Sequence, residues 1–181
     1  CIRERALEAL RKGLTRYTHS LGAYNLRCEI AEYYNEEYEL RSKVKPEDVI
    51  VTSGTSPALP LIFGAILDRN DEAILSNPHY PCYPNMIKFI GGKPRFVFVR
   101  EEEGFQLNPE KVKEAITKKT KAILINSPAN PTGNVLSPEW MEEIASLKVE
   151  DGRLLVTTLF GEQKEVEARI KEIDFMASSV V

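Results

Sequence analysis

The fold is decided by residues 122–133, which read Ala-Ile-Leu-Ile-Asn-Ser-Pro-Ala-Asn-Pro-Thr-Gly. Four apolar residues are followed at once by two polar-proline turns, which is the pattern of a short buried strand that ends in a tight loop. In open α/β sheets, ligands bind beside the carboxyl ends of the strands. Proline restricts the backbone of this loop, and the amide of Asn130 can both donate and accept hydrogen bonds. The segment predicts either a ligand-binding edge or an ordinary strand-to-helix connection.

Around this segment, strand patterns and helix patterns alternate along the chain. We expect helices that start behind the N-cap residues Asn108 and Ser137, and Pro60 fits a helix only within its first turn. The helix expected at 24–38 presents Leu26, Ile30 and two tyrosines, Tyr33 and Tyr34, on one face. Such alternation predicts an α/β fold with a mostly parallel sheet and helices on both faces. The expected strands are 48–52, 73–75, 95–99 and 122–125, and the expected helices are 2–12, 24–38, 57–67, 82–90, 109–116 and 138–147.

Composition limits the classes of function. The chain has 181 residues, 43% of them hydrophobic and 28% charged, which predicts one globular domain with an appendage. A net charge of −3 with interspersed signs disfavours nucleic acid or an anionic membrane as a partner. Three scattered cysteines are too few for a disulfide framework or a metal cluster. We therefore expect no metal site and a reducing, cytoplasmic setting.

Three further segments resemble known motifs. Residues 51–56 read Val-Thr-Ser-Gly-Thr-Ser, and residues 77–84 read Asn-Pro-His-Tyr-Pro-Cys-Tyr-Pro. Residues 16–22 read Arg-Tyr-Thr-His-Ser-Leu-Gly and are followed by Leu26-Arg27. Together with residues 126–133, these segments resemble in order and spacing the class I/II aminotransferases, fold-type I pyridoxal-phosphate enzymes, and within them the aspartate aminotransferase-like group. The resemblance implies transfer of amino groups between amino acids and 2-oxo acids with pyridoxal 5'-phosphate as cofactor.

The resemblance also implies a domain organisation. Residues 1–147 correspond to part of the large, cofactor-binding domain of the family, and residues 148–181 form a divergent or truncated strand-helix tail. Family resemblance further implies a homodimer. It also suggests that the Asn77-Pro78 and Asn130-Pro131 peptide bonds are cis.

Roles for six residues follow from the resemblance. Gly54, Thr55 and Ser56 would hold the cofactor phosphate, because a helix start offers N–H groups and a favourable dipole. A plain helix N-cap is the alternative for this segment. Tyr80 resembles the residue that stacks on the cofactor ring, and otherwise it is a surface aromatic. Its neighbours His79 and Tyr83 are expected to support it.

The other two of these residues contact the cofactor at different points. Asn130 resembles the family residue that hydrogen-bonds the phenolic oxygen of the cofactor. Tyr17 resembles the tyrosine that reaches across the dimer to the phosphate of the neighbouring site. The alternative for Tyr17 is a core aromatic beside a helix.

Several family motifs cannot be found in this sequence. Family enzymes carry Asp-Glu-x-Tyr and Ser-x-Ser-Lys after the region seen here, and the second motif supplies the Schiff-base lysine. Neither occurs in the chain, so no catalytic residue is identifiable. In the tail we expect a strand at 153–160 and a helix at 162–173. This tail either replaces the Asp-bearing strand, with Thr157-Thr158 in place of the carboxylate, or resembles the end of the C-terminal small domain, with Arg153 near the position of an arginine that binds substrate.

Two hypotheses of different class remain open. In the first, the chain represents an aminotransferase. In the second, it is a catalytically incompetent fragment that at most binds pyridoxal phosphate. A Rossmann dinucleotide-binding protein is disfavoured, because no Gly-x-Gly-x-x-Gly follows any expected strand.

Overall fold

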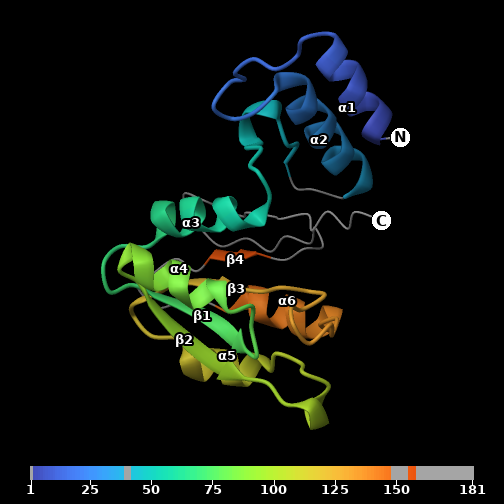
Figure 1. Cartoon of the computed structure of the whole chain (residues 1–181). Coiled ribbons are helices and arrows are strands. Elements are labelled where there is room, and N and C mark those ends of the chain that lie inside the picture. The colour runs from blue at the N-terminus through green and yellow to red at the C-terminus, as the bar shows by residue number, and fades with distance from the viewer. Residues whose placement is uncertain (1, 39–41, 148–154, 158–181) are drawn as a thin grey trace. The chain divides into compact units, whose positions relative to one another are not determined.

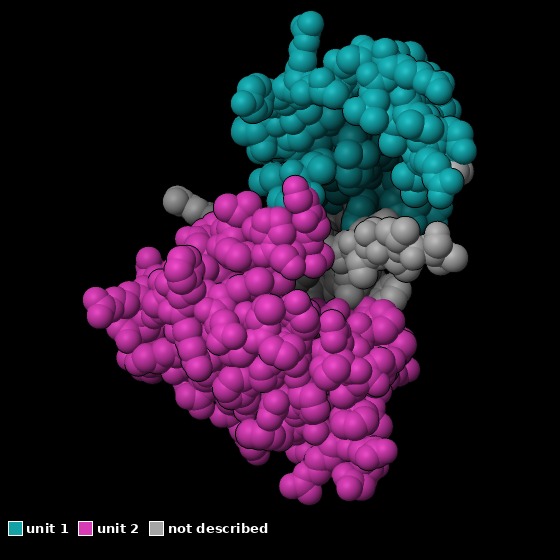
Figure 2. Space-filling model, viewed as in Figure 1, with its two compact units in different colours: residues 1–37, 42–52 teal, residues 38–41, 53–181 magenta. Residues whose placement is uncertain are grey.

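The computed structural model describes residues 2–38, 42–147 and 155–157. The chain divides into two compact units, which Figure 2 shows in different colours. Unit 1 comprises residues 1–37 and 42–52, and unit 2 comprises residues 38–41 and 53–181. Within the described residues, no helix combines the length and the apolar character needed to cross a bilayer.

Unit 1 is helical. It contains α1 (Ile2–Arg11), α2 (Tyr24–Glu37) and the short 3-10 helix η1 (Pro46–Asp48). The two helices lie close to the residues expected from the sequence. The strand expected at 48–52 is absent, because residues 46–48 form the 3-10 helix and residues 49–52 form no ladder.

The buried face of α2 differs from the face that hydrophobic spacing predicts. Leu26 and Tyr33 are exposed, whereas the buried residues of α2 are Arg27 and Ala31. The Arg27 guanidinium donates to the carbonyl of Pro46 (2.6 Å) and, through Nε, to that of Gly22 (3.3 Å). A charged residue becomes buried here because backbone carbonyls of two loops satisfy its donors. Arg27 therefore holds unit 1 together.

Unit 2 is a parallel sheet covered by helices (Figure 1). Four strands lie in the described part of unit 2 in the order β2-β1-β3-β4, and every neighbouring pair is parallel. The elements in chain order are α3 (Thr55–Ile66), β1 (Glu72–Asn77), α4 (Cys82–Ile90), β2 (Lys93–Phe98), the 3-10 helix η2 (Glu101–Glu103), α5 (Pro109–Ala115), β3 (Thr120–Leu124), α6 (Pro138–Ser146) and β4 (Leu155–Thr157).

Each face of the sheet carries its own hydrophobic cluster. On one face, β1 and β3 pack against α5 and α6, with Ile74, Val112 and Ile144 fully buried. On the other face they pack against α3 and α4, where Phe63 and Ile87 are buried. Consecutive side chains of β1 point to opposite faces of the sheet. Because helices cover both faces, the side chains on each face must be apolar. The prediction of an α/β fold with helices on both faces is confirmed.

The tail is described only at β4. Its residues pair with β3 in parallel, with Leu155 opposite Ala122 and Thr157 opposite Leu124. This pairing agrees with the interpretation that the tail supplies the strand after α6. The expected helix at 162–173, the Thr158 position and Arg153 lie outside the described residues.

Candidate functional site

The order of the strands locates the binding edge. The chain runs from β1 through α4 to β2 on one side of β1, and then through α5 to β3 on the other side. In doubly wound sheets, ligands bind beside the carboxyl ends of the strands at the point where the order reverses. β1 ends at Asn77 and β3 ends at Leu124, so the segments that follow these residues form the candidate site.

The segment after β1 is held by aromatic contacts. The Asn77-Pro78 bond is cis, as expected from the sequence. The ring of His79 stacks on Phe96 of β2, with centroids 5.1 Å apart, and its Nδ1 lies 3.1 Å from the carbonyl oxygen of Ser76. Because a carbonyl can only accept, this contact places a proton on Nδ1. His79 thus fixes the start of the loop against the sheet.

Tyr80 is half-buried in this segment. Its ring meets Tyr83 edge-on, with centroids 5.4 Å apart. A hydrogen bond with the Cys82 side chain raises the pKa of Tyr80, so its phenol stays neutral at ordinary pH. Burial raises the pKa of Tyr83, and the neighbouring Tyr80 and Cys82 add to this rise. The arrangement leaves a neutral aromatic ring at the carboxyl end of β1.

The segment after β3 carries Asn130. The Asn130-Pro131 bond is cis, as expected, and so is the Ser127-Pro128 bond, which the sequence did not predict. The Asn130 side chain is exposed, whereas Ser127 is only 1% exposed. Ser127 Oγ accepts a hydrogen bond from the N–H of Leu136 (3.0 Å), which closes the loop at its base.

Gly54 lies at the start of α3. It is the N-cap residue, with φ +92°, and a Cβ placed there would meet nothing within 4 Å. This backbone conformation favours glycine. Thr55 and Ser56 follow as the first two residues of the helix, and all three are exposed. The helix begins at Thr55, two residues before the expected start at residue 57, and the strand predicted to precede it is not formed.

The direction of α3 brings Gly54 toward the same edge. α3 leads through the short connection 67–71 into β1 and packs on that strand through Leu59 and Phe63. A helix joined to a strand in this way runs antiparallel to it, so the amino end of α3 faces the carboxyl end of β1 (Figure 1). Tyr80, Asn130 and the 54–56 segment therefore belong to one edge of unit 2.

Tyr17 is placed differently. It lies in unit 1, between α1 and α2, with its side chain fully exposed. This exposure disagrees with the alternative that Tyr17 is a core aromatic beside a helix.

Sequence analysis missed the residues that support the Asn130 loop. Gln106 and Asn134 form side-chain hydrogen bonds that join this loop to the segment before α5. The partners of Gln106 are 29 and 31 residues away in the sequence, so no local pattern could identify it. Asn134 directly follows the Asn-Pro-Thr-Gly motif, and this position was its only signal.

The described residues hold no cluster of three or more His, Cys, Asp or Glu side chains that is arranged to bind a metal ion. Cys28 and Cys82 are both free thiols.

Comparison with known proteins shows which family the chain resembles. The sequence model for aminotransferase class I and II matches residues 1–158. The chain is 44% identical to a probable aspartate/prephenate aminotransferase of Aquifex aeolicus over 156 residues, which cover 86% of the chain and 39% of that protein.

Solved structures agree with the sequence comparison. Aspartate aminotransferase from Thermus thermophilus with maleate superimposes with a TM-score of 0.80 at 43% identity, covering 87% of this chain and 41% of that one. Alanine aminotransferase from Pyrococcus furiosus gives a TM-score of 0.79 at 35% identity, covering 87% of this chain and 40% of that one. The chain spans about two fifths of the length of these relatives.

The tail also matches a second family. The model for the CO dehydrogenase accessory protein CooT matches residues 136–181, which overlap the end of the first match. This second match covers only the last quarter of the chain, whereas the first covers most of it. From the strand order, the loops at the carboxyl edge and the match over residues 1–158, we conclude that the chain belongs to the class I and II aminotransferase family.

Proposed function

We propose that the chain takes part in amino-group transfer between amino acids and 2-oxo acids, with pyridoxal 5'-phosphate as cofactor. One observation carries this proposal: the segments of Tyr80 and Asn130 leave the neighbouring strands β1 and β3 at the point where the strand order reverses. Both segments also carry the residues that the family uses around its cofactor. Family members use pyridoxal phosphate, which supplies an electron sink for the chemistry when it is bound.

The residues present fit the three parts of this cofactor. The exposed start of α3 offers main-chain N–H groups and the positive end of the helix dipole, which suit a phosphate. Gly54 leaves open space where a side chain would block close approach to the main chain. Tyr80 supplies a neutral ring for stacking, and the Asn130 amide can donate to a phenolate oxygen.

Each of these residues has a proposed task. Gly54, Thr55 and Ser56 bind the phosphate, with Ser56 adding a hydroxyl donor. Tyr80 covers the cofactor ring and keeps water from one of its faces. Asn130 holds the phenolic oxygen and thereby favours its ionised form.

For the polypeptide of residues 1–181 by itself, we propose cofactor binding without turnover. The sequence contains no Ser-x-Ser-Lys and no Asp-Glu-x-Tyr, which in the family supply the anchoring lysine and the carboxylate partner of the ring nitrogen. Amino-group transfer depends on both groups. For the isolated chain, this proposal is the hypothesis of a catalytically incompetent fragment. For the family to which the chain belongs, the activity is that of an aminotransferase.

An assay separates the two possibilities. Purified chain is incubated with pyridoxal phosphate, aspartate and 2-oxoglutarate, while equilibrium dialysis measures cofactor binding. We expect saturable binding that weakens in Asn130→Ala and Tyr80→Ala, without transfer of amino groups. Turnover that disappears in both variants would show that the site is complete and that a lysine was overlooked. Failure of the wild-type chain to bind would contradict the proposed cofactor role.

The substrate is proposed only as a class. Relatives of similar likeness are an aspartate/prephenate, an aspartate and an alanine aminotransferase. Residues that distinguish these substrates are therefore not identified by the similarity, and we propose an amino acid and a 2-oxo acid without naming either.

We also propose that the chain forms a homodimer through unit 1. Helix α1 buries none of its residues, although it is strongly amphipathic. Its apolar residues Ile2 and Leu10 are 80% and 63% exposed, and Leu14 just beyond it is 70% exposed. An uncovered apolar helix face is typical of an interface. Tyr17, which lies close by in the sequence, would then reach the phosphate site of the second copy.

We also propose a boundary after residue 147, between the partial cofactor-binding domain and the tail. Residues 148–181 would form a divergent or truncated strand-helix tail that follows a partial aminotransferase domain. The match of residues 136–181 to the CooT model supports a tail that diverges from the aminotransferase pattern. The pairing of β4 with β3 supports the view that part of this tail completes the sheet.

Amide hydrogen exchange in increasing denaturant tests this boundary. If the tail beyond β4 is a separate module, its amides will open at a different denaturant concentration from those of β1 and β3. A single common transition for tail and sheet would show that the two form one cooperative unit.

A further inference from the structure

The loop that carries Asn130 is tied to a distant segment of the chain. Gln106 binds it in two directions: Nε2 donates to the carbonyl of Val135 (2.8 Å), and Oε1 accepts from the N–H of Ser137 (3.0 Å). Asn134 adds a third link, because its Nδ2 donates to the carbonyl of Phe105 (2.9 Å). Three hydrogen bonds thus connect residues 134–137 to residues 105–106.

The loop is also closed within itself. The N–H of Ala129 donates to the carbonyl of Asn134 (2.9 Å), and the N–H of Gly133 donates to the carbonyl of Ala129 (2.7 Å). Thr132 Oγ1 donates to Oδ1 of Asn134 (2.5 Å). Asn134 therefore uses both ends of its amide, one inside the loop and one outside it. Any shift of the Asn134 side chain would disturb both sets of contacts.

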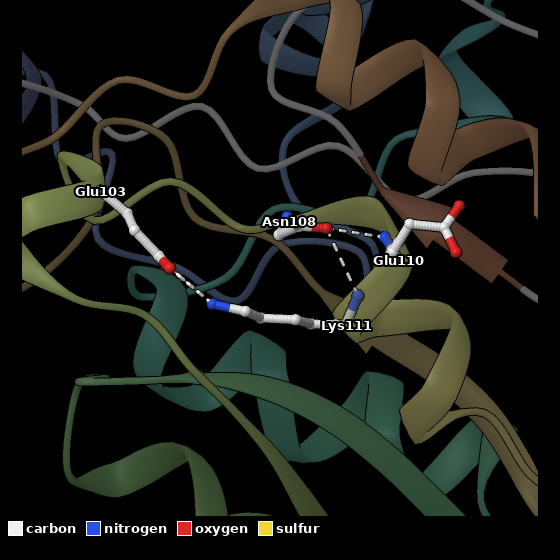
Figure 3. A network of polar contacts seen from close by, with 4 residues as sticks. All are labelled: Glu103, Asn108, Glu110 and Lys111. Atoms are coloured by element: carbon white, nitrogen blue, oxygen red, sulfur yellow. Dashed lines mark hydrogen bonds and ion pairs between the residues drawn. The ribbon is translucent and has the colours of Figure 1, made fainter.

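The segment that holds the loop is itself fixed. Figure 3 shows the ion pair between Glu103 and Lys111 (2.8 Å), which connects η2 to α5. Figure 3 also shows Asn108, whose side chain accepts from the N–H groups of Glu110 (2.8 Å) and Lys111 (3.4 Å). The carbonyl of Phe105 and the side chain of Gln106 lie between these two anchors in the sequence. They offer the Asn130 loop a rigid base.

The backbone of the loop matters for Asn130 because its side chain projects into solvent. Within the described part of the chain, its amide makes no hydrogen bond and the side chain is exposed. The backbone of the loop therefore sets the position of the Asn130 Cα–Cβ bond, from which the amide extends. A backbone held in place before a ligand arrives lowers the entropic cost of binding.

We propose that Gln106 and Asn134 are positioning residues that hold the loop backbone from which the Asn130 amide reaches the cofactor. The proposal rests on the proposed function insofar as Asn130 binds pyridoxal phosphate. Neither side chain touches the cofactor in this account. Each acts through the backbone of residues 129–137, and the loss of either one loosens the loop while the sheet stays intact.

The chain offers a matched control in unit 1. The Asn35 amide also bonds to backbone in both directions: Nδ2 donates to the carbonyl of Val44 (2.9 Å), and Oδ1 accepts from its N–H (2.8 Å). Asn35→Ala therefore removes contacts of the same kind at a place remote in the sequence from the Asn130 loop. Gln106→Glu keeps the acceptor for Ser137 but places a carboxylate oxygen against the carbonyl of Val135, so it tests the donor to Val135 separately.

The first measurement is amide hydrogen exchange on the whole chain without ligand. The informative amides are those of Gly133 and Leu136, since their acceptors are untouched in Gln106→Ala and Asn134→Ala. Each variant removes two hydrogen bonds, and because the monitored amides feel this loss only through the backbone, we expect both to exchange about three- to tenfold faster. The amides of Ile74 and Ile123 in the sheet should not change. Unchanged exchange in the loop, or faster exchange everywhere, would overturn the proposal.

The second measurement is pyridoxal phosphate affinity by equilibrium dialysis. We expect Gln106→Ala, Asn134→Ala and Gln106→Glu each to weaken binding about three- to tenfold, and Asn35→Ala to leave it unchanged. In an Asn130→Ala background, the Gln106 substitution should have no further effect, because the residue it positions is gone. Additive losses in that background would overturn the positioning role. If wild-type chain does not bind, the proposed function fails, while hydrogen exchange still decides whether the loop is clamped.

Discussion

At the scale of single residues, the site combines exposed groups with buried ones that hold them. Asn130 faces solvent, and Ser127 and Gln106 fix the loop from which it projects. The sequence motif identified Asn130, since prolines and glycine mark the loop around it. It could not identify Gln106, because hydrogen bonds between segments about 30 residues apart leave no local pattern.

Tyr83 is expected to make stability depend on alkaline pH. Burial raises the pKa of its phenol, so the folded state holds the proton more tightly than the unfolded chain, whose tyrosines titrate at about 10. Its contribution to stability is complete below that value and is lost as the pH rises through the raised pKa. We expect the free energy of unfolding of Tyr83→Phe, measured by urea titration, to fall less steeply with pH than that of wild type above pH about 10. Parallel pH curves for the two proteins would show that Tyr83 is not desolvated.

Gly22 is expected to tolerate no side chain. Its φ is +99°, and an added Cβ would lie 2.6 Å from Cβ of Val51. We expect Gly22→Ala to destabilise the protein by about 2–4 kcal/mol, from backbone strain and overpacking together. Gly13→Ala serves as the control, because its φ is +68° and nothing lies within 4 Å of the added atom. That substitution should cost about 1–2 kcal/mol in urea unfolding followed by circular dichroism. Equal losses at the two positions would argue against the close contact.

At the scale of elements, helices were easier to predict than strands. The limits of α4 match the expected 82–90, and Asn108 and Ser137 cap α5 and α6 as expected. Helix signals are local, since capping and periodicity lie within the element. Pro60 was expected in a first turn and lies in the second turn of α3. Its missing N–H removes one bond, to the carbonyl of Ser56, near the exposed start of the helix.

The strand expected at 48–52 shows why the rest could not be predicted. Its apolar pattern is suitable, but a strand exists only when another strand lies beside it. Among the described residues, the backbone of Val51 donates a single bond, to the carbonyl of Leu21, and no ladder forms. The absence of a suitable neighbour is a property of the tertiary structure, which a window of sequence does not contain.

Helix α5 is expected to depend on its cap. Asn108 satisfies two N–H groups at the start of the helix, and the helix has only seven residues. We expect Asn108→Ala to lower the free energy of unfolding by about 1 kcal/mol, with Asn108→Asp close to wild type. Urea denaturation monitored by Trp140 fluorescence measures the change, since that residue lies in α6 of the same unit. An unaffected Asn108→Ala variant would mean that packing alone holds α5.

At the scale of the whole molecule, the two units differ in what they present to solvent. Unit 2 carries the candidate site on a sheet that the sequence largely predicted, whereas unit 1 presents apolar helix surface. The chain was expected to be one domain with an appendage at its end. Within the chain, contacts separate the first 52 residues, apart from 38–41, from the sheet. Hydrophobic periodicity marks α1 as amphipathic without indicating what covers it.

Self-association is expected to depend on α1. Leu10 in α1 and Leu61 in α3 are equally exposed, at 63% each, which makes them a matched pair. We expect Leu10→Glu to weaken dimerisation by about tenfold or more, because a symmetric interface loses the same side chain twice. Leu61→Glu should leave it unchanged in sedimentation equilibrium. Dissociation by Leu61→Glu alone would place the interface on unit 2 instead.

The strand order has a consequence for folding during translation. β1 precedes the other described strands in the chain and has neighbours on both sides, yet its second neighbour begins only at Thr120. At roughly 5–20 residues per second, the inner edge of the nascent β1–β2 pair stays open for a few seconds. An open strand edge invites pairing with other nascent chains. When ribosomes follow one another closely on the messenger RNA, more of the protein should therefore aggregate than when the ribosomes are widely spaced.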